Sequence, residues 1–335
     1  MTYSAKSILA LSFFNLLLIL SNFKLINNKN LFTLDDIDMK NWMSRLPDDK
    51  KIVLINLAGT HDSAAFDMLN PLFDKLAQCQ FFSISEQLMI GIRKFDIRAT
   101  EKSSDLICCH GILDCYYEDE QKSKNLLQYK QVVEEVKNFL EQYPTETVFF
   151  STDSGRGVKY TNIKWATEIF EEIIPRKMRV KYNRDLTLGE LRGKIIYDFY
   201  KTDQIDEEGK PVYNSGIEGG SGIGEIHEKY ANYETFKVDG ALKVEELKEL
   251  FKIYDNVSFK DAEIDFAKNP LKYPLKYSIS CTWEKKNIIP LPRTMAETVN
   301  PFVLSYDLKR GHYYGWINMD FAEINIAKKI IETNF

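Results

Sequence analysis

Four short polar clusters in this sequence combine residue types that can cleave a phosphodiester. They are Gly59–Ser63 (GTHDS), Phe95–Arg98 (FDIR), His110–Gly111 and Asn318–Phe321 (NMDF). Together they supply two histidines, several carboxylates and one arginine. Phosphodiester cleavage needs a general base, a general acid, groups that orient them, and a cation for the charge of the phosphorane. The clusters therefore form a minimal catalytic set.

Each cluster also has a purely structural interpretation. A histidine at a strand end is often a hydrogen-bonded surface residue, and an Asp-x-Arg pattern is often a local ion pair. The chain has only four histidines, however, and both His61 and His110 stand near glycines, which allow a substrate to approach the backbone. We interpret His227 and His312, in a loose loop and a turn, as solvent-facing.

The elements that must position these clusters can be predicted from hydrophobic patterns. Short β-branched or aromatic runs predict strands at Ile52–Asn56, Lys94–Arg98, Leu106–Cys109, Thr147–Ser151, Lys194–Phe199, Tyr277–Thr282 and Gly315–Met319. Apolar stripes predict helices at Val132–Leu140, Leu242–Phe251 and Ile324–Ile331. This alternation and the length predict an α/β fold, a distorted TIM-type barrel with one catalytic domain over 35–335. The polar clusters then fall at the C-terminal ends of strands, where barrel enzymes place catalytic side chains.

The composition narrows the class of partner and the compartment. The 335 residues carry a formal net charge of −5, without the basic character typical of nucleic-acid binding proteins. Lys6 and the apolar run Ile8–Leu20 predict a signal peptide or signal anchor over 1–22, so that the folded part is secreted or faces a lumen.

The chain has five cysteines, and none of them forms a CxxC pair, which disfavours a zinc knuckle. They are Cys79, Cys108, Cys109, Cys115 and Cys281. An oxidising compartment would permit disulfides, but the odd number leaves at least one thiol over or pairs it between chains.

The order of the motifs resembles the X domain of bacterial-type phosphatidylinositol-specific phospholipases C. The resemblance begins at Trp42–Ser44 and Leu54–Ser63, continues through Gln87–Arg98 and His110–Gly111, and includes Phe139–Val148 and Arg192–Ile196. It closes with Gly315–Phe321 and so spans almost everything after residue 40. The GTHDS, DIR and HG motifs in this order are specific, whereas each of them alone is weak.

The resemblance implies a two-step, metal-free mechanism with no cofactor. His61 would be the general base that takes the proton of the inositol 2-hydroxyl, and Asp320 would orient it. His110, supported by Asp62, would protonate the departing diacylglycerol oxygen. Arg98, held by Asp96, would stabilise the phosphorane, where the calcium-dependent relatives carry an acidic ligand instead. The products would be inositol 1,2-cyclic phosphate and diacylglycerol.

The sequence departs from the family pattern mainly around the headgroup. Ala58 stands in place of the usual proline, which we expect to be harmless. Thr152–Ser154 and Phe199–Tyr200 stand where the family has a lysine and an arginine. Glu228 and Tyr230 match an acidic and an aromatic inositol contact. The catalytic set is complete, whereas the residues of the headgroup pocket differ from the family pattern.

Three interpretations follow for function. The first is a phospholipase C acting on phosphatidylinositol or glycosylphosphatidylinositol, the second is an X-domain phosphodiesterase for another lipid headgroup, and the third is a catalytically silent lipid-binding protein. The intact catalytic set disfavours the third. No nucleic-acid or protein partner is implied.

A membrane contact is predicted at Asn70–Leu76, which resembles in position a short helix that dips into the bilayer. Its Leu72, Phe73 and Leu76 form a small apolar patch that suits an interface. Ordinary core packing is an equal alternative.

Overall fold

The computed structural model describes residues 37–154, 160–200, 244–278 and 291–335. Residues Met39–Phe335 form one compact unit. The predicted signal segment 1–22 lies outside the described residues, as do Glu228, Tyr230, His227 and Cys281.

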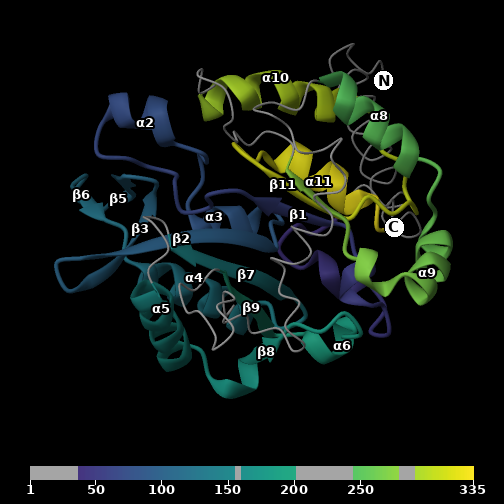
Figure 1. Cartoon of the computed structure of the whole chain (residues 1–335), viewed down its shortest axis with the longest axis horizontal. Helices are drawn as coiled ribbons and strands as arrows, with labels where there is room; N and C mark the ends of the chain where they lie inside the picture. The colour runs from purple at the N-terminus through teal and green to yellow at the C-terminus, as the bar shows by residue number, and fades with distance from the viewer. Residues whose placement is uncertain (1–36, 155–159, 201–243, 279–290) are drawn as a thin grey trace, which may run out of the picture. The chain divides into compact units, whose positions relative to one another are not determined.

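The unit is built on a mostly parallel sheet, as the alternation of elements predicted (Figure 1). Seven strands run parallel in the spatial order β10, β11, β1, β2, β7, β9, β8. Their bounds are β1 Leu57–Thr60, β2 Lys94–Lys102, β7 Thr147–Ser154, β8 Arg179–Lys181, β9 Lys194–Tyr200, β10 Lys276–Ser278 and β11 Trp316–Met319.

The remaining strands pair in the antiparallel direction. β3 (Asp105–His110) pairs with β2, and β4 (Leu113–Asp114) pairs with β3. β5 (Tyr116–Glu118) and β6 (Lys124–Leu126) form a separate hairpin.

Helices connect and cover these strands (Figure 1). They are α2 Pro71–Ala77, α3 Ile84–Met89, α4 Tyr129–Gln142, α5 Tyr160–Ile173, α6 Leu188–Leu191, α8 Val244–Tyr254, α9 Phe259–Lys268, α10 Pro292–Ser305 and α11 Ile324–Glu332. Short 3₁₀ turns occur at η1 Trp42–Arg45, η2 Ile52–Leu54, η3 Arg176–Met178 and η5 Pro270–Lys272. The stripe expected for α4 is buried, which confirms that helix.

Aromatic rings show that the sheet is curved like a barrel. Phe149 of β7 and Trp316 of β11 lie with ring centroids 4.9 Å apart, although β1 and β2 separate their strands in the sheet. Tyr182 packs edge-on against both rings. Side chains can meet in this way only if they point into a common interior, as in a barrel core. Within the described residues no strand pairing joins β8 to β10, so the barrel is distorted and open there.

One strand prediction was wrong. Ile52–Leu54 forms a buried 3₁₀ turn, and β1 begins only at Leu57. A short apolar run predicts burial but does not separate a strand from a turn. Here the amide of Ile52 donates to the Leu186 carbonyl, and the amide of Leu54 donates to the Lys51 carbonyl. These hydrogen bonds keep the segment out of the sheet.

Candidate active site

His61 and Asp320 meet where two neighbouring parallel strands end. His61 follows β1, Asp320 follows β11, and the amide of His61 donates to the Met319 carbonyl. His61 Nδ1 lies 2.9 Å from Asp320 Oδ1, and both residues are buried. The next residue, Asp62, adopts a left-handed conformation with φ 41°, which turns the chain across the end of the sheet.

Asp62 is the carboxylate at the centre of the site. Its Oδ1 lies 2.7 Å from Arg98 Nε. Its Oδ2 lies 3.3 Å from His110 Nε2 and 3.4 Å from His61 Nε2. The resemblance implied that Asp62 supports His110 alone, whereas the geometry connects it to both histidines and to the arginine.

Arg98 and Asp96 lie two residues apart on β2, so their side chains share one face of the strand. The Nη2 atom of Arg98 is 2.9 Å from His61 Nε2 and 3.4 Å from Asp96 Oδ2. The contact of Arg98 with Asp62 is therefore shorter than its contact with Asp96, the expected holder.

His110 reaches the site from a strand that is not part of the parallel barrel. β2 runs past the other strands and β3 returns antiparallel, with Ala99 opposite Cys108, which brings His110 back toward Arg98. The His110 ring is held by the carbonyl of Ala77 at the end of α2, 2.7 Å from its Nδ1. His110 ends a strand, as expected, but this strand is antiparallel to β2 and lies outside the parallel strands of the barrel.

The two histidine rings have different partners. His61 Nδ1 faces the Asp320 carboxylate, which can only accept, and its Nε2 faces Arg98, which can only donate, as well as Asp62. Both ring nitrogens of His110 face oxygen atoms, those of the Ala77 carbonyl and of Asp62. The Arg98 contact therefore distinguishes the environment of His61 from that of His110.

The charges of the site are fixed by their neighbours. Burial alone would raise the pKa of Asp96, but Arg98, then His61 and Lys94, outweigh it and lower that pKa to about 2. Burial alone would lower the pKa of Arg98, yet the surrounding carboxylates raise it above its usual value. Burial raises the pKa of Asp320, against the attraction of His61. The site thus keeps a permanent cation beside two histidines.

Two buried amide side chains hold this arrangement, and neither was found from the sequence. Gln80 Nε2 donates to the carbonyls of His61 and Met319, at 2.8 and 3.0 Å. Asn300 Nδ2 donates to the carbonyls of Asp320 and Phe321, both at 3.1 Å. A lone Gln on a connecting segment, such as Gln80, and a lone Asn within a helix, such as Asn300 of α10, have no sequence pattern that marks such a role.

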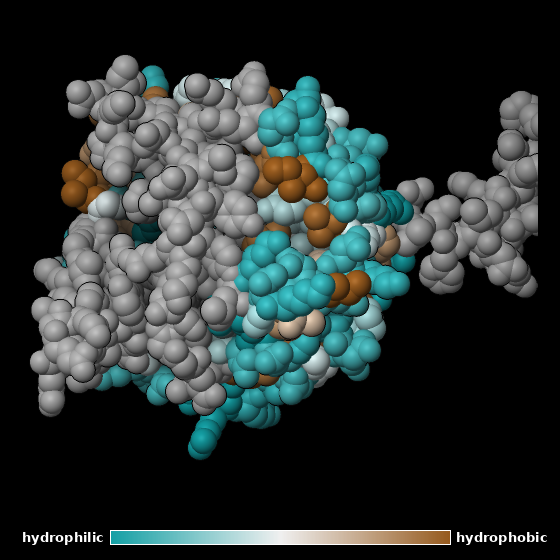
Figure 2. All heavy atoms as spheres, turned by 45° about the vertical axis from the view of Figure 1, so that its right-hand side comes forward, coloured by the Kyte–Doolittle hydropathy of each residue, from teal (hydrophilic) through white to brown (hydrophobic). Residues whose placement is uncertain are grey.

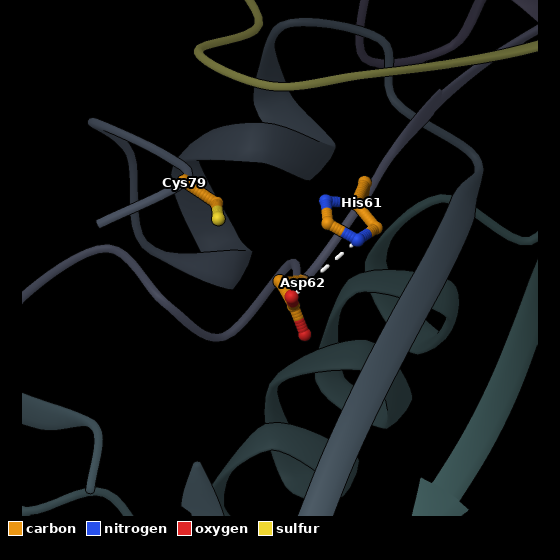
Figure 3. Close-up of side chains that lie close together, drawn as sticks. All are labelled: His61, Asp62 and Cys79. Atoms are coloured by element: carbon orange, nitrogen blue, oxygen red, sulfur yellow. Dashed lines mark ion pairs between the residues drawn. The ribbon is translucent and has the colours of Figure 1, made fainter. Parts of the chain in front are cut away.

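In the described part of the chain, one group of side chains is close enough to share a metal ion. The group is His61, Asp62 and Cys79, whose ligand atoms lie within 4.8 Å of one another (Figure 3). Arg98 contacts both Asp62 and His61, so a hard cation there would adjoin the guanidinium. Burial raises the pKa of the Cys79 thiol, which disfavours the thiolate that metals bind. The set does not fit a calcium site, which needs about 6–8 oxygen ligands.

The residues predicted to contact a membrane lie on α2, close in sequence to Ala77, whose carbonyl contacts the His110 ring. Leu72 and Leu76 are 63% and 48% exposed, whereas Phe73 is half-buried. The core-packing alternative therefore does not hold for the two leucines. The Asn70 side chain caps the helix by accepting from the amides of Leu72 and Phe73. None of the helices in the described ranges combines the length and apolar character that a bilayer span requires.

A family model matches the part of the chain that holds most of the candidate site. The model, described as PI-PLC X, matches residues 48–164, a range that includes five of the six catalytic candidates and excludes only Asp320.

Two bacterial proteins are similar to this chain in sequence. The chain is 30% identical over 168 residues to a 1-phosphatidylinositol phosphodiesterase of Staphylococcus aureus (strain Newman), covering 47% of this chain and 49% of the relative. It is 29% identical over 178 residues to one of Listeria monocytogenes serovar 1/2a, covering 51% and 52%. The chain thus spans about half the length of the curated relatives it matches.

Solved structures extend the likeness to nearly the whole chain. A phosphatidylinositol-specific phospholipase C from Listeria monocytogenes matches with a TM-score of 0.56 at 22% identity, covering 89% of this chain and 100% of that one. The F249X mutant of the Staphylococcus aureus enzyme matches with a TM-score of 0.61 at 20% identity, covering 89% and 98%. At this identity the match establishes the fold, and it confirms the predicted α/β barrel class.

Proposed function

We propose that this chain is a phospholipase C-type phosphodiesterase that cleaves an inositol phospholipid by histidine base and acid catalysis. The observation that carries the proposal is the meeting of His61, His110 and Arg98 around one buried carboxylate, Asp62. A base and an acid around one carboxylate are what a two-step diester cleavage needs. The names of the bacterial relatives point to the same chemistry.

In the proposed reaction, His61 Nε2 takes the proton of the inositol 2-hydroxyl as that oxygen attacks phosphorus. The bond from phosphorus to the glycerol oxygen breaks, and His110 Nε2 gives its proton to that oxygen. Arg98 turns its Nη2 from His61 to a non-bridging phosphate oxygen, while its Nε stays on Asp62. A guanidinium held in this way stabilises the developing charge without reorganisation of water.

The headgroup is the less specified part of the proposal. On β7 the Thr152 hydroxyl is buried against the hydroxyl of Tyr129, 2.9 Å away, and Asp153 lies opposite Arg98 in the strand register. These positions thus offer no cation to a phosphorylated inositol, which suits unphosphorylated phosphatidylinositol or a glycosylphosphatidylinositol anchor. We propose Glu228 and Tyr230 as inositol contacts on the basis of the resemblance alone.

The location follows from the same proposal. A secreted or lumenal enzyme would meet such lipids at a membrane surface, and the exposed leucines of α2 would contact the bilayer beside the site.

The test is a product analysis on three substrates. Purified full-length protein is incubated with phosphatidylinositol vesicles, a glycosylphosphatidylinositol-anchored protein, and phosphatidylcholine vesicles. Phosphorus NMR should show the 1,2-cyclic phosphodiester before any acyclic monophosphate, and only from the inositol lipids. Immediate monophosphate would assign water as the nucleophile and remove His61 from its role. Cleavage of phosphatidylcholine alone would favour the other-headgroup alternative, and no cleavage of any lipid would favour the silent binding protein.

A further inference from the structure

The turn that carries His110 is flanked by two cysteines that face each other. β3 and β4 pair with Cys109 opposite Asp114 and His110 opposite Leu113. One step further from the turn, the same register places Cys108 opposite Cys115. The amide of Cys115 donates to the Cys108 carbonyl at 2.9 Å, which confirms that the two backbones are adjacent there.

This placement meets the backbone requirements of a disulfide. Directly opposed residues of an antiparallel pair that share a hydrogen bond have Cα atoms about 5.5 Å apart. Disulfides span Cα separations of about 4.4–6.8 Å. Opposed side chains also point to the same face of the two strands. No other pair among the described cysteines is opposed in this way, because the neighbouring Cys109 points to the other face and stands opposite Asp114.

The surroundings of the pair agree with this geometry. Cys108 and Cys115 are buried, at 0% and 1% exposure, and both are free thiols in the structure. Burial raises the pKa of Cys115, and the nearby Cys108 raises it further, as expected for neighbouring thiols. The backbones of Cys108, Cys115 and Leu127 close a triangle of hydrogen bonds, so the strands are already aligned without a cross-link.

We propose that Cys108 and Cys115 form a disulfide that fixes the His110 turn. The oxidant is a disulfide such as oxidised glutathione. One cysteine thiolate attacks it to give a mixed disulfide and release one thiol, and the second cysteine displaces the other thiol to form the internal bond. The two protein thiols lose two protons and two electrons, and the glutathione disulfide gains them. This inference does not depend on the proposed lipase activity.

The bond would act on the segment that supplies the candidate acid. The six residues between the two cysteines include His110, whose contacts with Ala77 and Asp62 fix its ring. Closing this short ring removes open conformations of the turn, so the oxidised protein should unfold at a higher temperature than the reduced one. Because both thiols are buried, we expect the bond to form during folding and to resist reduction once folded.

The experiment is a disulfide map of the full-length wild type. The protein is refolded in glutathione buffers of increasing oxidised fraction, alkylated, and digested without reduction by a protease that cleaves before aspartate. Cleavage before Asp105, Asp114 and Asp119 separates Cys115 from Cys108 and Cys109. The expected product is residues 105–113 linked to residues 114–118, lighter than the two free peptides by two hydrogens.

Two variants show which cysteine of the peptide 105–113, Cys108 or Cys109, is linked to Cys115. Cys109→Ser, the matched control on the same strand, should keep the link and the rise in melting temperature. Cys108→Ser should lose both. A link from Cys115 to Cys79, Cys109 or Cys281, or full alkylation of Cys108 and Cys115 at every glutathione ratio, would overturn the proposal. The wild-type map decides this even if a variant does not fold.

Discussion

His61 and His110 approach the same carboxylate, Asp62, from two different kinds of structure. His61 follows a central barrel strand, and Gln80 clamps its carbonyl to that of Met319. His110 ends an antiparallel strand, and its side chain is 22% exposed compared with 8% for His61. The proposed base is therefore part of the barrel, whereas the proposed acid lies on a hairpin beside it. The comparison teaches that the two roles can be separated experimentally.

The largest expected effect is a difference in how the activities of the two histidine variants depend on the leaving group of the substrate. His61→Ala and His110→Ala should each lower kcat by about 10²–10⁴-fold on phosphatidylinositol, the range for losing a positioned base or acid. On an inositol phosphate ester of p-nitrophenol, His110→Ala should recover much of its loss, because a phenolate departs without protonation. His61→Ala should recover nothing, since the 2-hydroxyl still needs a base. Steady-state kinetics on both substrates measure the difference.

The control is His312→Ala, a half-buried histidine in a turn whose Nδ1 faces the Arg310 carbonyl. It should leave both rates near those of the wild type. Equal recovery of the two variants on the phenyl ester would mean that the assigned roles are wrong.

A second prediction concerns Arg98, which contacts His61 directly and also contacts Asp62, the carboxylate shared by the two histidines. Arg98→Lys should lower kcat by about 10²–10³-fold, the cost of removing one donor to a developing oxyanion. Lysine keeps the charge but cannot bind Asp62 and a phosphate oxygen with one planar fork. Activity of the wild type should persist in excess EGTA, because the guanidinium supplies the positive charge.

Arg310→Lys is the matched control, since Arg310 is an exposed arginine paired with Glu332. It should change neither rate nor metal response. Inhibition of the wild type by EGTA that calcium reverses would contradict the role of Arg98 and favour a metal-dependent mechanism.

A third prediction uses the depressed pKa of Asp96. Its folded value of about 2 lies below the usual 3.8, so its ionised form stabilises the fold above pH 4 and this contribution disappears as pH falls toward 2. Asp96→Asn should cost roughly 2 kcal/mol of unfolding free energy at pH 7, from the size of that shift. Urea unfolding at pH 7, 4 and 2.5 should show the difference from wild type shrinking with acidity.

Asp185→Asn is the control, because Asp185 pairs with Lys51 at the surface with 74% of its side chain exposed. Exposed ion pairs contribute about 0–1 kcal/mol, so its effect should be small at each pH. A constant deficit of Asp96→Asn across this range would show that packing, not charge, holds the side chain.

The sequence predicted which residues meet but not how they are connected. His61 and Asp320 follow parallel strands, whose carboxyl ends lie at one edge, so their meeting follows from strand assignment. The sharing of Asp62 depends on its left-handed backbone, which a GTHDS pattern does not reveal. The antiparallel course of β3 depends on a tight return after Lys102. Gln80 and Asn300 each act through hydrogen bonds to two carbonyls that are distant in the sequence. Such tertiary contacts leave no periodic trace in a sequence.

The smallest expected effect concerns α2, the helix whose Ala77 carbonyl lies 2.7 Å from Nδ1 of His110. Leu72→Ser should weaken binding to phosphatidylinositol vesicles by several-fold, because a partly inserted leucine contributes about 1 kcal/mol, less than the 1.5–3 kcal/mol of full burial. Turnover of a soluble inositol phosphate ester should not change, since Leu72 is exposed and lies outside the catalytic contacts. Vesicle sedimentation and steady-state kinetics measure the two quantities separately.

Ile264→Ser provides the matched control on α9, where the side chain is 48% exposed. Figure 2 brings forward the side of the unit on which α8 and α9 lie, and hydrophobic atoms form only small, separate patches among hydrophilic ones there. α9 contacts η2, which precedes β1, and therefore lies toward the end of the sheet opposite the candidate site. Ile264→Ser should consequently leave vesicle binding unchanged. If both variants weakened vesicle binding equally, bilayer contact would not be specific to α2. If Leu72→Ser instead lost activity equally on vesicles and on the soluble ester, the helix would act by supporting His110 through Ala77.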